Sequence, residues 1–63
     1  MSVGSAIRRH RTERGWSKAR LARLTGFSRT SILYWEREEH EPRRVAVERL
    51  EAVFGLEEGS LNE

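Results

Sequence analysis

The chain has 63 residues and no cysteine, which allows a single domain over residues 1–63 and excludes a disulfide scaffold and a thiolate metal site. Its apolar runs are shorter than the roughly 20 residues of a membrane span and include no signal peptide, so we expect a cytoplasmic protein without a membrane partner. Residues 1–34 hold eight basic residues and one acid, whereas residues 35–63 hold four basic residues and nine glutamates, and this polarity favours a polyanionic partner for the first half.

The pattern of apolar residues predicts an all-α protein, because no long alternation typical of strands is present. The first helix is expected over residues 3–14, where Val3 and Ile7 are four apart and share an inner face. Gly15 can adopt the left-handed conformation that ends a helix. Trp16 follows it and is expected in the core.

The second helix is expected over residues 18–25. Ser17 precedes it and offers a hydroxyl to an unpaired backbone N–H of the first turn. Leu21 and Leu24 are three apart and are predicted to face inward. Gly26 ends this helix and tolerates the positive φ of a tight bend.

The third helix is expected over residues 29–37, with Ser28 as its N-cap. Ile32 and Trp35 are three apart and are predicted to face the core. The positions left on the outer face carry polar, aromatic and apolar side chains. These are Arg29, Thr30, Leu33 and Tyr34.

The fourth helix is expected over residues 43–54, after a loop that ends in Pro42, whose fixed φ favours a helix start. The predicted core positions in this helix are Val47, Leu50 and Phe54. Gly55 ends it, and a weak final turn is expected over residues 57–61. We interpret the glutamates of the second half mainly as a solvated face.

Residues 17–37 read SKARLARLTGFSRTSILYWER, which predicts two helices joined by a glycine turn. This stretch resembles the helix-turn-helix of the Cro and lambda-type phage repressors, with its Leu-Ala pair, Gly-Phe-Ser, Trp-Glu-Arg and a later Glu-Pro. The resemblance extends over residues 7–61. It implies a lambda-repressor-like compact bundle of five short helices, in which the second and third form the helix-turn-helix at about residues 18–37.

The resemblance also implies a role for each matching side chain. Base edges would be contacted from the start of the third helix and one turn later, by Arg29, Thr30, Tyr34 and Leu33. Phosphates would be contacted by Ser17, Lys18, Ser28, Arg37 and Arg43. Arg11 and Glu36 would form a structural ion pair between the first and third helices. An apolar dimer contact would involve Leu56 and Leu61.

Two positions depart from the family pattern. Lys18 stands where the family often has Gln, which favours a phosphate contact over a base contact at this position. Glu38 stands where many members have Gly. Together with Glu39 and Glu41 it places negative charge in a loop near DNA, which is expected to weaken binding.

The predicted function is sequence-specific binding of double-stranded DNA as a bacterial or phage repressor or regulator in the nucleoid. It would read an inverted-repeat operator with the third helix in the major groove, as a weak homodimer strengthened on DNA. The alternatives are the antitoxin of a toxin–antitoxin pair, and a protein-interaction module that kept the fold without DNA binding. We expect no enzyme activity, cofactor, metal site or small-molecule substrate, because no nucleophile–base pair or metal-ligand spacing is present.

Overall fold

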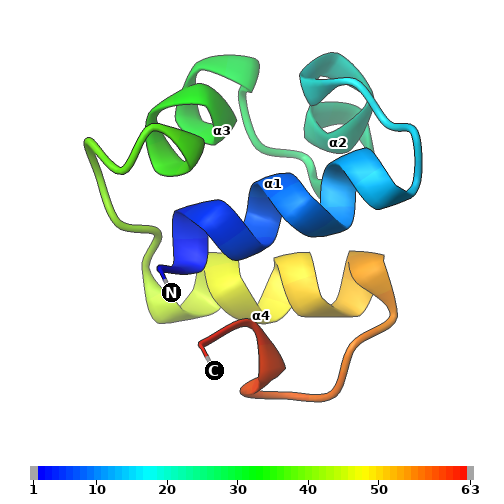
Figure 1. Ribbon diagram of the computed structural model, residues 1–63, viewed down its shortest axis with the longest axis vertical. Coiled ribbons are helices and arrows are strands. Elements are labelled where there is room, and N and C mark those ends of the chain that lie inside the picture. Colours follow the sequence, from blue (N-terminus) through cyan, green and yellow to red (C-terminus); the bar gives the residue numbers. More distant parts are fainter. Residues whose placement is uncertain (1, 63) are drawn as a thin grey trace.

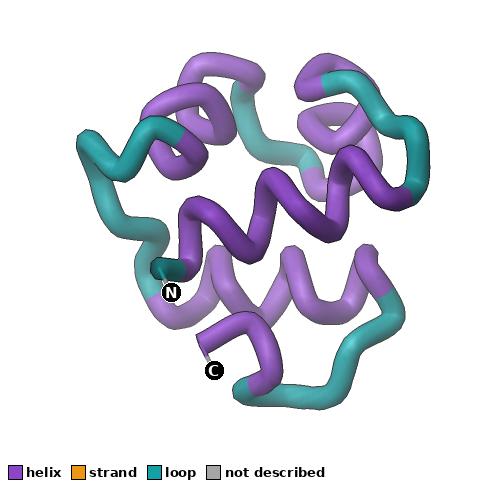
Figure 2. Tube along the Cα trace, viewed as in Figure 1, coloured by secondary structure: helices purple, strands orange, loops and turns teal. Residues whose placement is uncertain are grey.

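The computed structural model describes residues 2–62 and shows four α-helices followed by a short 3-10 turn (Figure 1). The elements are α1 (Val3–Glu13), α2 (Lys18–Thr25), α3 (Arg29–Glu36), α4 (Arg44–Phe54) and the 3-10 turn Ser60–Asn62. No strand occurs among these residues (Figure 2). The all-α prediction is therefore confirmed, but the expected fifth helix is only a three-residue 3-10 turn.

Helix α1 packs against α3, α4 and the 3-10 turn. In the view of Figure 1, α2 and α3 lie above α1, and α4 and the 3-10 turn lie below it. Helix α2 also packs directly against α4. No helix in residues 2–62 combines the length and the apolar character needed to cross a membrane.

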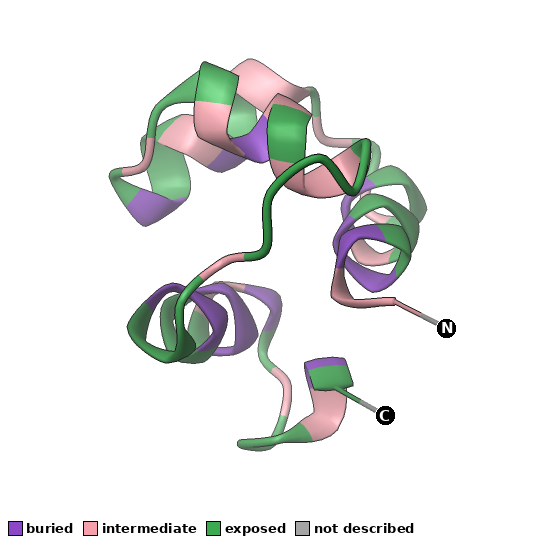
Figure 3. Ribbon diagram, turned by 90° about the vertical axis from the view of Figure 1, so that its left-hand side faces the viewer, coloured by how far each residue is buried: buried purple, intermediate pink, exposed green. Residues whose placement is uncertain are grey.

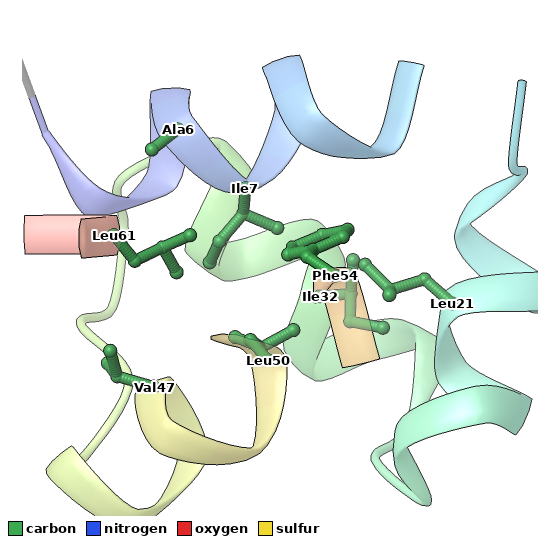
Figure 4. Packing of buried hydrophobic residues seen from close by; sticks show 8 residues of the cluster. All are labelled: Ala6, Ile7, Leu21, Ile32, Val47, Leu50, Phe54 and Leu61. Carbon is green, nitrogen blue, oxygen red and sulfur yellow. The ribbon is translucent and has the colours of Figure 1, made fainter. Parts of the chain in front are cut away.

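Each helix contributes one side chain with no exposed surface to a shared core (Figure 4). These side chains are Ile7, Leu21, Ile32 and Leu50. Around them pack both tryptophans, Phe27 and Phe54, and Trp16 stacks on Phe54 at 5.9 Å between ring centroids. One core therefore fixes all four helices, and a change in the packing of one helix is transmitted to the others.

Serine side chains begin the first three helices. Ser17 accepts a hydrogen bond from the backbone N–H of Arg20, and Ser28 accepts one from Ser31, as the sequence predicts. Ser2 caps α1 in the same way. Helices α1, α2 and α4 are each followed by a glycine with positive φ, which confirms the predicted helix ends.

The helix bounds differ from the prediction by one residue at three places. Helix α1 ends at Glu13, α3 ends at Glu36, and α4 begins at Arg44. Pro42 therefore lies two residues before the first helical residue, and Arg43 is an N-cap without a side-chain hydrogen bond. The spacing of apolar residues does not specify the exact first and last residues of a helix.

Three burial predictions were wrong. Leu24 is 45% exposed, and Thr25 takes the inner position because the buried seam of α2 continues from Leu21 by four residues, not three. Glu51 is buried, not solvated: its Oε2 accepts the backbone N–H groups of Gly59 and Leu61, each at 3.0 Å. Leu61 is only 1% exposed; its side chain belongs to the core and is not available for the predicted dimer contact.

Gly4 allows α1 to pack closely against the end of α3. A Cβ atom at this position would overlap the backbone carbonyl oxygen of Trp35. The first turn of α1 therefore contains a residue of low helix propensity for a packing reason. No local pattern in the sequence predicts this role for Gly4, because Trp35 is distant from it in the chain.

Candidate nucleic-acid interface

The outer face of α3 is open to solvent. Arg29 and Thr30 are exposed in its first turn, Tyr34 is 37% exposed one turn later, and Leu33 is partly buried. Most of α3 is exposed or intermediate in burial (Figure 3), and its buried residue, Ile32, lies in the core (Figure 4). The short helix thus holds its inner face rigidly and presents the four predicted base-contacting side chains away from the core.

An open groove of about 480 Å³ lies between the start of α2 and the first two turns of α3. It is lined by Arg11, Ser17, Lys18, Ala19, Arg29, Thr30 and Leu33. The structure therefore brings two predicted phosphate contacts beside three predicted base contacts. Tyr34, Arg37, Ser28 and Arg43 do not line this groove.

The Arg11–Glu36 pair connects the elements that form the two walls of this groove. Nε and Nη2 of Arg11 donate to the two carboxylate oxygens of Glu36 at 2.7 and 2.9 Å, and Nη1 donates to the carbonyl of Trp16 at 2.9 Å. The hydrogen bond to Glu36 raises the pKa of Arg11 above its usual value. Because Trp16 precedes α2 and Glu36 ends α3, one guanidinium ties both walls of the groove to α1.

The two capping serines differ in what they can still offer a ligand. The Ser17 hydroxyl accepts from the N–H of Arg20, and its own proton stays available for a phosphate oxygen. The Ser28 hydroxyl accepts from the N–H of Ser31 and donates to the Ser31 hydroxyl at 2.9 Å. Ser17 is therefore the better placed of the two to donate to the DNA backbone.

The acidic loop after α3 folds back on the end of that helix. Arg37 pairs with Glu39 at 3.0 Å, and both side chains are about half exposed. His40 packs its ring edge-to-face on Tyr34, with centroids 5.4 Å apart. One predicted phosphate contact is thus paired with a carboxylate of its own chain.

Two arginines that sequence reasoning did not single out satisfy helix C-termini. Arg49 donates to the carbonyl of Thr25 at 3.1 Å, behind the glycine turn between α2 and α3. Arg14 donates to the carbonyl of Phe54 at 2.7 Å and lies over its ring. The last carbonyls of a helix attract cations, but the helix that each arginine serves lies far from it in sequence, so no local pattern reveals the contact.

Within residues 2–62, no group of three or more His, Cys, Asp or Glu side chains is arranged to hold a metal ion. The groove instead combines the cations Lys18 and Arg29 with the hydroxyls of Ser17 and Thr30 at the starts of α2 and α3. Cations, hydroxyls and helix N-termini are the groups that contact phosphates in protein–DNA complexes.

The comparisons with known proteins agree with this geometry. A family model described as helix-turn-helix matches residues 7–61. Uncharacterised HTH-type transcriptional regulators from Mycobacterium bovis and from two strains of Mycobacterium tuberculosis are each 41% identical over 59 residues, which is 94% of this chain. The chain spans only 23% of the length of these relatives. No solved structure matches the chain significantly.

Proposed function

Because the chain belongs to the Cro/C1-type helix-turn-helix family of DNA-binding regulators, we propose that it is a transcriptional repressor that reads an operator half-site with α3. Its place of action is then the bacterial nucleoid. The relatives are named as transcriptional regulators, which supports regulation as the outcome of binding.

The observation that carries the proposal is the groove between α2 and α3. It joins a cation and a hydroxyl at the start of α2, Lys18 and Ser17, to an exposed arginine on α3, Arg29. With α3 in the major groove, Arg29 donates two hydrogen bonds to a guanine edge, and Lys18 and Ser17 hold the flanking phosphates. Thr30, Leu33 and Tyr34 complete the set of base contacts, and Ser28, Arg37 and Arg43 extend the set of phosphate contacts.

A two-fold dimer on an inverted repeat forms the second part of the proposal. Half-sites about one helical turn apart place both copies on one side of the duplex. Of the two leucines predicted for the dimer contact, only Leu56 retains exposed surface. We therefore expect weak self-association in the absence of DNA and stronger pairing on it.

The test is selection of bound sequences from a pool of random duplexes, followed by titration of the selected duplex. We expect an inverted repeat, and we expect Arg29→Ala to lose about 1–3 kcal/mol of binding free energy while relaxing the preference at one base position. Arg23→Ala is the matched control, since Arg23 is an exposed arginine of α2 outside the groove. It is expected to weaken binding slightly and equally for all sequences.

Failure to enrich any sequence, together with weak binding that disappears at moderate salt, would overturn the proposal. The antitoxin and protein-module alternatives would then predict a protein partner. The acidic second half of the chain would be the surface to examine.

A further inference from the structure

The groove between α2 and α3 has an apolar part between its cationic walls. Leu33 and Ala19 line it together with Thr30, whose side chain carries a methyl group. Leu33 and Ala19 are both partly buried, whereas Arg29 and Thr30 are exposed. Leu33 therefore forms a partly buried, apolar part of the groove surface beside the more exposed side chains of Arg29 and Thr30.

An apolar surface of this kind needs an apolar group on its ligand. The edges of base pairs in the major groove carry hydrogen-bond donors and acceptors, and the 5-methyl group of thymine is the one apolar group among them. A polar base edge placed against Leu33 would lose its water without gaining a partner. The same position occupied by thymine would bury a methyl group against leucine.

We propose that Leu33 is a specificity-determining residue that selects a 5-methylpyrimidine within the half-site. Arg29 and Leu33 are one helical turn apart, about 6 Å along the axis of α3, and base pairs are stacked about 3.4 Å apart. The selected thymine thus lies within about two base pairs of the guanine contacted by Arg29. The inference rests on the proposed function and names one of the bases that the operator must contain.

The experiment replaces each thymine of the selected half-site, one at a time, by deoxyuridine, which differs only by the loss of the 5-methyl group. For the wild-type protein we expect one position where affinity falls about fourfold, the value of burying one methyl group against apolar surface. At the same position, 5-methylcytosine should bind more tightly than cytosine by a similar factor. The wild-type protein alone therefore tests for methyl recognition.

Leu33→Ala assigns the effect to the side chain. This variant should bind the thymine and deoxyuridine duplexes equally at that position and keep the other preferences of the wild type. Leu24→Ala is the matched control, because Leu24 is an exposed leucine of α2 outside the groove, and it should retain the wild-type discrimination. Circular dichroism at the assay temperature verifies that both variants are folded.

The outcomes separate the inference from the proposed function. Enrichment of an operator without sensitivity to any thymine methyl group overturns the role of Leu33 alone. The same follows if Leu33→Ala discriminates as the wild type does. Absence of any enriched sequence overturns both the proposed function and this inference.

Discussion

At the scale of single residues, the buried polar groups are fully partnered. Within the described residues, no buried side-chain nitrogen or oxygen lacks a hydrogen bond. Arg11, Glu36 and Glu51 are charged groups in or near the core, and each takes part in at least two hydrogen bonds. Removing one member of such a buried pair leaves the charge of the other member buried without a partner, which destabilises the folded state.

Arg11→Met is expected to destabilise the protein strongly. It leaves Glu36, whose side chain is only 4% exposed, without its cation, and breaking a buried pair in this way costs about 3 kcal/mol or more. The double variant Arg11→Met with Glu36→Leu removes both charges and should regain most of that loss. Urea denaturation of the two single variants and the double variant measures the coupling. Equal stability of Arg11→Met and the double variant would contradict the prediction.

At the scale of elements, capping residues and glycines in the sequence predicted the bounds of the helices closely. The capping serines at positions 17 and 28 and the glycines after α1, α2 and α4 place the helix ends within one residue. Spacing alone placed Leu24 inside, because residues three and four apart are almost equally close on a helix. Contacts between distant segments, such as Gly4 with Trp35 or Glu51 with the 3-10 turn, have no local signature.

The residues of the candidate interface were predicted from the resemblance to the helix-turn-helix family. Five of these residues, Ser17, Lys18, Arg29, Thr30 and Leu33, line one groove, and the glycine turn that joins the two helices could be read from the sequence. The pairing of Arg37 with Glu39 was not predicted. A surface ion pair depends on side-chain rotamers that the order of residues does not specify.

The loop after α3 contains a strained residue. Glu38 has a φ of +62°, the left-handed region that costs a residue with a Cβ atom about 1 kcal/mol relative to glycine. Glu38→Gly should therefore raise the stability by up to about 1 kcal/mol. Thermal unfolding compared with Glu41→Gly is the measurement, because Glu41 lies in the same loop without a positive φ. An equal gain in both variants would indicate a charge effect and not relief of strain.

The same loop is expected to weaken DNA binding. Glu39 holds the guanidinium of Arg37 at 3.0 Å, so a phosphate must replace the carboxylate before Arg37 can contact it. Glu39→Gln should tighten binding and steepen its dependence on salt by about one phosphate contact. Glu48→Gln is the matched control, since Glu48 is equally exposed and also paired with an arginine, on α4. Filter binding over a series of salt concentrations measures both, and identical slopes for the two variants would refute a specific competition at Arg37.

At the scale of the whole molecule, a small core supports a surface with one cationic part and one acidic part. The chain measures only 24 × 24 × 20 Å, so a domain of this size has a thin margin of stability. The cationic groove lies between α2 and α3, whereas the exposed glutamates Glu48, Glu57 and Glu58 lie on α4 and between α4 and the 3-10 turn. A charge distribution of this kind orients the protein as it approaches a polyanion and keeps its acidic side away from it.

Because the free energy of unfolding of so small a domain is low, protonation of a single side chain, His10, is expected to change it noticeably. This side chain is 16% exposed and lies against Phe54, and burial together with the nearby Arg9 and Arg14 lowers the pKa of His10 below 6.5, against a smaller raising effect of Glu13. The unfolded chain then binds a proton near pH 6.5 that the folded chain accepts only at lower pH. Stability is therefore complete above that value and falls as the pH decreases below 6.5.

His10→Gln should remove this part of the pH dependence. Urea denaturation at a series of pH values between about 5 and 8 measures it, a range above the usual pKa of glutamate. His40→Gln is the control, because it leaves His10 and its neighbours in place and should keep the wild-type slope. If His10→Gln loses stability toward low pH as steeply as the wild type does, proton uptake at the junction of α1 and α4 is not the cause. If the slope disappears, that junction is the part of this small core that responds first to acid.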